Sequence, residues 1–249
     1  MNSVARTRPA RALVALALAG TLVSCTALGP KPNQTLLNLA RQASADAQTA
    51  PHEQSRALRQ EHASMLFAEV ERLCGFDENG AVPDSCAFDR TASAPSPDPL
   101  GAYLAAVKKV PEESRDLVIQ QAVDLAAYDD SPLTVESFNN EHDQALARDL
   151  LEREYAAIYA LEAARAFNGD PSYDKVVAEH ENMALALRSV THNPPAPEAG
   201  YVLPENLDAH GIDTNIKDAW RAAASAAESD EGRTWFVRAA GHAISEENE

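Results

Sequence analysis

Aromatic residues, glycine and basic residues are scarce in this chain of 249 residues. Aromatic side chains make up 6% of it, and its ten glycines form neither a phosphate-binding loop nor a dinucleotide-binding pattern. Lysine and arginine total 21 against 38 aspartates and glutamates, which gives a formal net charge of −17. Because such an acidic surface repels polyanions, we expect no nucleic-acid partner.

No apolar run in the sequence is long enough for a typical membrane-spanning helix. Residues 12–23 are largely apolar, but a span needs roughly 20 residues. Three arginines and no acidic residue precede this run, as in the charged head of a secretory signal. The run ends in Leu-Val-Ser-Cys, which resembles the cleavage signal of bacterial lipoproteins. We therefore predict a signal peptide over 1–24, cleaved before Cys25, and a lipidated tether over 25–34.

The modification expected at Cys25 is a diacylglycerol on its thiol. Two or more acyl chains make a stable anchor, which predicts a protein held on the extracytoplasmic face of the cell membrane. Cleavage would change the net charge from −17 to −20, because the leader holds three arginines and no acid. The alternative is an ordinary signal peptide with a chance cysteine beside its cleavage site.

Apart from Cys25, the chain contains only two cysteines, Cys74 and Cys86. In an oxidising compartment outside the cytoplasm, a lone pair of this kind predicts one disulfide. The alternative is a redox-active pair, although such cysteines usually lie two residues apart. The segment between them has no helical or strand periodicity, so we expect a loop closed by the bond.

Alanine supplies much of the apolar content, and no stretch shows the alternation of a strand, which indicates an all-α protein. We expect helices over about 35–73 (broken near Pro51), 100–109, 111–128, 135–167, 171–191, 213–229 and 230–245. A loop is expected over 198–212. Short connections favour an up-and-down bundle. An N-terminal helical region, 35–130, and a second region, 131–249, should pack into one bundle.

The second region carries a family resemblance. The segment Glu-Tyr-Ala-Ala-Ile-Tyr-Ala-Leu-Glu-Ala-Ala-Arg-Ala at 154–166 precedes a helix containing His180 and then the segment Pro-Pro-Ala-Pro-Glu-Ala-Gly-Tyr-Val-Leu-Pro. In order and spacing these resemble an actinobacterial ferritin-like family without an established activity, over roughly 144–245. The resemblance implies a ferritin-like bundle, to which this chain adds N-terminal helices. Where the family has Glu-His, this chain has Glu154-Tyr155, which removes one nitrogen ligand.

The standard di-iron signature of ferritin-like bundles is absent from the sequence. It requires a glutamate three residues before a histidine on each of two helices. None of the seven histidines has an acidic residue at that position. A carboxylate-bridged di-iron centre of the usual kind is therefore not predicted.

Glu154 and His180 instead lie among apolar residues at three- and four-residue spacing, as does His62 on an earlier helix. A buried carboxylate needs a partner, and His180 is the first candidate. One interpretation is a structural Glu–His or Glu–Tyr hydrogen bond. Another is a metal site of Glu154, His180 and His62 for Fe, Mn or Zn, with Tyr155 or Tyr159 nearby. A third is that the helix phase is misjudged and these groups face solvent.

The sequence contains no nucleophile elbow and no activated nucleophile that we can identify. We therefore expect a non-catalytic binding or regulatory module for another envelope protein or cell-wall component. One alternative is a ferritin-like metal-binding protein or oxidase with a degenerate site. Another is a carrier of a small molecule or lipid, which would need an apolar cavity between helices.

Overall fold

The computed structural model describes residues 29–129, 131–133, 137–169, 172–203 and 208–245. These residues form eight α-helices and no strand, which confirms the all-α prediction. The helices are α1 (Gln34–Thr49), α2 (Glu53–Cys74), α3 (Pro99–Ala106), α4 (Arg115–Ala126), α5 (Glu141–Asn168), α6 (Ser172–Val190), α7 (Ala209–Ala226) and α8 (Asp230–Ser245). None of the helices in these ranges is long and apolar enough to cross a membrane.

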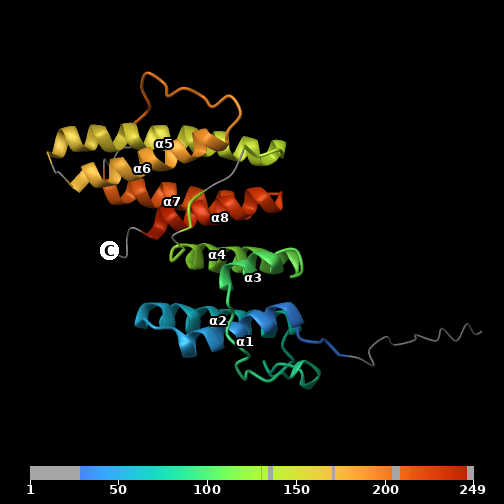
Figure 1. Cartoon of the computed structure of the whole chain (residues 1–249). Coiled ribbons are helices and arrows are strands. Elements are labelled where there is room, and N and C mark those ends of the chain that lie inside the picture. The colour runs from blue at the N-terminus through green and yellow to red at the C-terminus, as the bar shows by residue number, and fades with distance from the viewer. Residues whose placement is uncertain (1–28, 130, 134–136, 170–171, 204–207, 246–249) are drawn as a thin grey trace, which may run out of the picture.

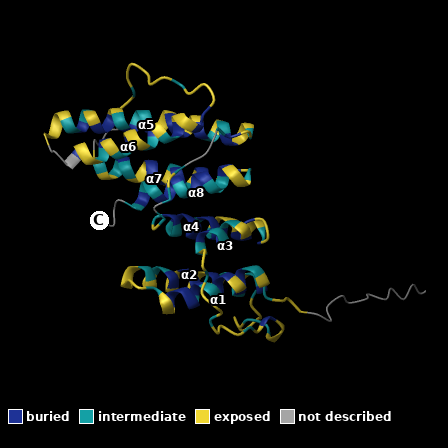
Figure 2. Ribbon diagram, in the orientation of Figure 1, coloured by how far each residue is buried: buried dark blue, intermediate teal, exposed yellow. Residues whose placement is uncertain are grey.

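The helices stack in successive pairs (Figure 1). The α1–α2 hairpin lies at one end, followed by α3 and α4, then α7 and α8, and finally α5 and α6 at the other end. Helix α4 packs on α8 and α7, and α5 packs on both α6 and α7. The buried residues line the faces between these layers, whereas exposed residues gather on the outer surfaces (Figure 2).

Side-chain caps determine where two of the helices begin. Asn140 accepts a hydrogen bond from the backbone N–H of Asp143 at 3.0 Å, so α5 begins at Glu141, later than predicted. Asp208 likewise accepts from the backbone N–H of Gly211 at 3.1 Å. Helix α7 therefore begins at Ala209, and the loop predicted over 198–212 is wrong in its last four residues. Both starts follow the usual preference of Asn and Asp for the N-cap.

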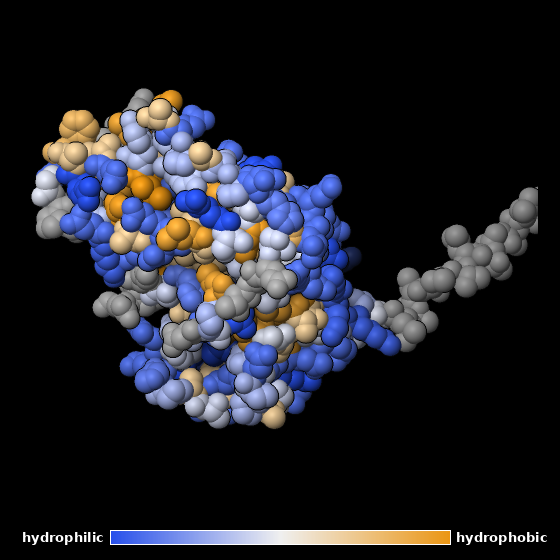
Figure 3. Space-filling view, turned by 45° about the horizontal axis from the view of Figure 1, so that its top comes forward, coloured by the Kyte–Doolittle hydropathy of each residue, from blue (hydrophilic) through white to orange (hydrophobic). Residues whose placement is uncertain are grey.

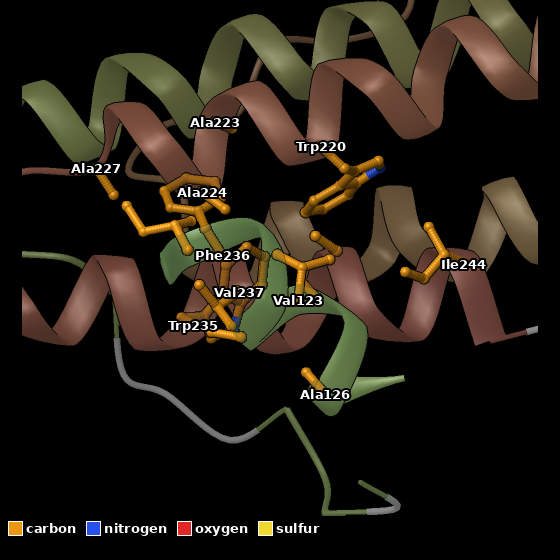
Figure 4. Close-up of a cluster of buried hydrophobic side chains, with 14 of the residues drawn as sticks. Val123, Ala126, Trp220, Ala223, Ala224, Ala227, Trp235, Phe236, Val237 and Ile244 are labelled. Carbon is orange, nitrogen blue, oxygen red and sulfur yellow. The ribbon is translucent and has the colours of Figure 1, made fainter. Parts of the chain in front are cut away.

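The core between α4, α7 and α8 is built from aromatic and small side chains (Figure 4). Trp220, Trp235 and Phe236 are at most 2% exposed and form the centre of this core. Alanines and valines from all three helices fill the space around the rings. Fully burying one large apolar side chain contributes about 1.5–3 kcal/mol, so this cluster is a main source of the stability of the bundle.

The structure pairs Cys74 with Cys86, as predicted, with their Cα atoms 6.2 Å apart. Cys74 ends α2, and Cys86 belongs to a short 3-10 turn, Asp84–Cys86. Both cysteines are buried. Closing a loop near this size stabilises a fold by roughly 3 kcal/mol in the chain-entropy model. The disulfide therefore stabilises a segment that has no regular secondary structure of its own beyond the short turn.

We expect the substitution Gly241→Ala to destabilise the protein by about 1–3 kcal/mol. A Cβ added at Gly241 of α8 would lie 2.5 Å from the backbone carbonyl carbon of Ala126 on α4, so the two helices would have to separate. Thermal unfolding measures the effect. Gly211→Ala is the control, because its added Cβ would lie 3.3 Å from the end of the Asp208 side chain. An unchanged melting temperature for Gly241→Ala would contradict this account.

Candidate functional site

Glu154 of α5 is fully buried, and both of its carboxylate oxygens accept hydrogen bonds. Oε2 lies 2.8 Å from Nδ1 of His180 on α6. Oε1 accepts from the indole N–H of Trp220 on α7 at 2.6 Å. The structure thus brings Glu154 and His180 together inside the bundle, where their apolar spacing predicted them. The carboxylate ties three helices to one another.

His180 connects this carboxylate to a second one. Its other ring nitrogen, Nε2, lies 3.5 Å from Asp213 Oδ1, which is the distance of an ion pair rather than of a well-formed hydrogen bond. Asp213 Oδ2 in turn lies 2.8 Å from Lys217 Nζ, one helical turn further along α7. Trp220, Glu154, His180, Asp213 and Lys217 form what we call the Glu154 network, in which positive and negative charges alternate.

The charges in the Glu154 network follow from its geometry. Burial alone would lower the pKa of His180, but Asp213 and Glu154 favour the charged imidazolium and together raise this pKa to about 9. Burial would raise the pKa of Asp213. The hydrogen bonds and positive charges that His180 and Lys217 provide outweigh burial and lower this pKa below its ordinary value. At neutral pH His180 is therefore a cation with two N–H donors, and Asp213 is an anion.

The predicted metal site does not fit this arrangement. Both ring nitrogens of His180 already face carboxylates, since Nδ1 lies 2.8 Å from Glu154 and Nε2 lies 3.5 Å from Asp213, so a metal at this ring would have to replace one of these contacts. Both oxygens of Glu154 already accept hydrogen bonds from the protein. Across the described part of the chain, no three His, Cys, Asp or Glu side chains are grouped so that they could hold a metal ion. The donors at this site suit a charge-paired structural contact better than Fe, Mn or Zn.

The structure does not bring His62 to this pair. His62 is buried on α2, where its Nε2 lies 3.2 Å from Asp124 Oδ2 on α4. Its Nδ1 lies 3.0 Å from Nη1 of Arg59. In Figure 1, α2 belongs to the layer at the opposite end of the stack from α5 and α6. A site of Glu154, His180 and His62 is therefore not formed.

Arg59 organises a second buried polar cluster that the sequence analysis missed. Its guanidinium lies 2.7 Å from the Asp46 carboxylate, donates to the Tyr103 hydroxyl at 3.3 Å and stacks 5.2 Å from the centre of that ring. Asp46 also accepts from the backbone N–H of Ser96 at 2.8 Å. This cluster joins α1, α2 and α3, and His62 extends it to α4 through Asp124. Its contacts explain how an arginine can be only 4% exposed.

Tyr155 and Tyr159 bind the segment that follows α6 rather than Glu154. The hydroxyl of Tyr155 donates to the carbonyl of Pro195 at 3.4 Å. The ring of Tyr159 lies 5.6 Å from the ring of Tyr201 and is partly exposed. This segment arches over α5 in Figure 1. The two tyrosines therefore help to hold the arch on the outer face of α5.

A cavity of about 210 Å³ lies beside the Glu154 network, between α6, α7 and α8. Its wall includes Glu179, His180, Met183, Asp213, Lys217 and His242. Sequence reasoning found His180 but missed the residues of α7. A signal was present, because Asp213, Lys217 and Trp220 are spaced by four and three residues and so share one helical face.

Comparison with protein families, curated proteins and solved structures finds no match to this chain. The ferritin-like resemblance of residues 144–245 therefore stays a prediction. The chemistry of the site has to be inferred from its own geometry.

Proposed function

We propose that this protein is a lipoprotein of the cell envelope, held to the extracytoplasmic face of the cell membrane by lipid on Cys25. The cleavage signal that ends at this cysteine is the observation that carries the proposal. The pairing of Cys74 with Cys86 supports it, because disulfides persist in oxidising compartments outside the cytoplasm. In this proposal residues 1–24 are removed, and residues 25–34 become the tether.

We further infer that the anchored domain binds rather than catalyses, and that its partner is another envelope protein or a cell-wall component. The Glu154 network supports this inference because its charges are paired within the protein. Glu154 has both oxygens engaged, so it is poorly placed to exchange a proton with a substrate. The role of Glu154 is then to hold α5, α6 and α7 in register, while the envelope partner binds at the outer surface.

The surface also supports a binding role. The face shown in Figure 3 is mainly hydrophilic, with apolar areas between the charged residues. Large apolar side chains are exposed on α5, α6 and the segment after α6, where Phe167, Leu185 and Val202 are 76%, 59% and 99% exposed. Contiguous apolar patches rimmed by polar residues mark protein interaction sites, and we place such a site among the apolar areas of this face.

We also propose that residues 144–245 form a ferritin-like bundle without the metal chemistry of that fold. The resemblance of the sequence supports the fold, and the hydrogen bonds that engage both oxygens of Glu154 and Nδ1 of His180 within the protein argue against a metal-binding or oxidase function. A lipid carrier is not favoured either, because charged groups contribute to the walls of the described cavities. A cleft of about 660 Å³ between α4, α7 and α8, for example, includes Lys108, Arg115 and Glu228 in its wall.

The substitution Cys25→Ser tests the anchor. We expect the variant to lose the mass of the lipid and to leave the membrane fraction, because the acyl chains can no longer be attached to a thiol. Fractionation of cells and mass spectrometry of the purified chain measure both effects. The double variant Cys74→Ser/Cys86→Ser is the control and should remain in the membrane fraction. A Cys25→Ser protein that is processed and retained like the wild type would rule the proposal out.

A further inference from the structure

The cavity between α6, α7 and α8 contains buried polar atoms that form no hydrogen bond. His180 is 4% exposed, and its Nε2 forms no hydrogen bond within the described part of the chain. Oε1 of Glu179 is also a buried atom that forms no hydrogen bond there, and it lies 3.7 Å from Lys175 Nζ. Both residues belong to the wall of the cavity, as does His242, whose Nε2 also forms no hydrogen bond within the described residues. Buried polar atoms are normally satisfied, so these three require an explanation.

Nε2 of His180 and Oε1 of Glu179 have opposite requirements. Because Nδ1 of His180 is directed at Glu154, the opposite edge of the ring carries Nε2 toward Asp213 and the cavity. A protonated imidazole offers an N–H donor at that edge, whereas a glutamate oxygen offers only an acceptor. A single small molecule could satisfy both atoms only if it carried an acceptor and a donor.

The remaining charges of the wall also have both signs. Asp213 is an anion, and the ammonium group of Lys217 lies 2.8 Å from it. A simple anion would meet the carboxylates of Glu179 and Asp213, and a simple cation would meet His180 and Lys217. A molecule with one positive and one negative end can avoid both conflicts, since each of its ends can lie against a group of opposite charge.

We propose that this cavity binds a small zwitterion of amino-acid size, whose carboxylate accepts a hydrogen bond from His180 Nε2 and whose ammonium group pairs with Glu179. A volume of about 210 Å³ is smaller than the usual pocket for a drug-sized ligand and suits a molecule with few heavy atoms. Met183 and Ala243 provide an apolar part of the wall for a short side chain. The inference goes beyond membrane anchoring and holds whether or not Cys25 carries lipid.

The experiment uses the full chain purified in detergent, with histidine labelled by ¹⁵N. The Nε2 resonance of His180 is identified by its loss in the variant His180→Gln. The probes are L-alanine, acetate and ethylammonium. We expect L-alanine to shift this resonance saturably, with a dissociation constant on the order of 1 mM for a ligand of about six non-hydrogen atoms. Acetate and ethylammonium should each bind about tenfold more weakly or worse.

Two neighbouring variants on α6 make the test specific. Glu179→Gln should weaken L-alanine binding about tenfold, because a charge-assisted hydrogen bond to the ammonium group is lost. Glu181→Gln is the matched control, since Glu181 is exposed on the same helix, and it should bind like the wild type. Circular dichroism verifies that both variants fold.

Three results would overturn the proposal. These are no saturable shift with L-alanine, acetate binding as tight as that of L-alanine, and equal L-alanine affinity in Glu179→Gln and Glu181→Gln. None of these results bears on membrane anchoring, which the fractionation of Cys25→Ser decides separately.

Discussion

Replacing Glu154 by alanine is expected to destabilise the protein by about 3–5 kcal/mol, the usual cost of removing one partner from a buried ion pair. The substitution would leave His180 without the carboxylate at 2.8 Å and the indole N–H of Trp220 without its acceptor. It would also leave space in a fully buried position. All three effects act in the same direction, since each leaves a buried group or volume uncompensated.

Urea unfolding at pH 7 measures this loss. Glu154→Gln should cost less, about 1–3 kcal/mol, because its amide oxygen still accepts one hydrogen bond while the charge opposite His180 is gone. Glu152→Ala is the matched control on α5; its exposed side chain should change the free energy of unfolding by no more than about 0.5 kcal/mol. If Glu154→Ala cost no more than Glu152→Ala, the Glu154 network would not be a main support of the bundle.

The sequence was sufficient to predict that Glu154 and His180 are buried and adjacent. Both lie on apolar stripes, and the helices that carry them are joined by a short connection at Gly169, which has a φ of 65°. Such a connection places α5 and α6 antiparallel, so groups on their facing stripes meet. Helical periodicity and turn chemistry are local properties, and these can be inferred from one sequence.

The partners on α7 could not be inferred in the same way. Asp213 and Trp220 are 59 and 66 positions from Glu154 along the chain, and their approach depends on how α7 packs against α5 and α6. His62 illustrates the same limit. Its spacing correctly predicts burial, yet its side chain contacts Arg59 of its own helix and Asp124 of α4 rather than α5 or α6. Periodicity identifies the buried face of a helix but not the helix that covers it.

The ends of two helices could be predicted from the sequence, whereas two helix starts were not. Pro51 and the Asn-Gly pair before Pro171 correctly indicate where α1 and α5 end, since proline and glycine act through the backbone itself. The starts of α5 and α7 differ from the prediction because Asn140 and Asp208 cap these helices. Asn and Asp are favoured at the N-cap, so the residue types that fix these starts are present in the sequence.

The stability of the protein is expected to fall as the pH rises from about 6.5 to about 9. In the unfolded chain a histidine has a pKa near 6.5. In the folded protein burial lowers the pKa of His180, but Asp213 and Glu154 outweigh burial and raise this pKa to about 9. Between these values only the folded protein holds the proton, so raising the pH favours unfolding. The stabilisation is complete below pH 6.5 and lost above pH 9.

A shift of this size corresponds to about 3 kcal/mol at 1.36 kcal/mol per pKa unit. Urea unfolding of the wild type and of His180→Gln from pH 6 to pH 9.5 measures it, because the difference between the two proteins removes the contribution of other groups. The wild type should lose most of that free energy across this range, and the variant should lose little of it. Asp213 has the opposite pH dependence, because its pKa is lowered in the folded protein. The stability that it contributes is present above the ordinary pKa of aspartate and is lost as the pH falls through the lowered value. Parallel pH profiles for the two proteins would show that His180 is not held as a cation inside the bundle, and the zwitterion site proposed beside it would lose its donor.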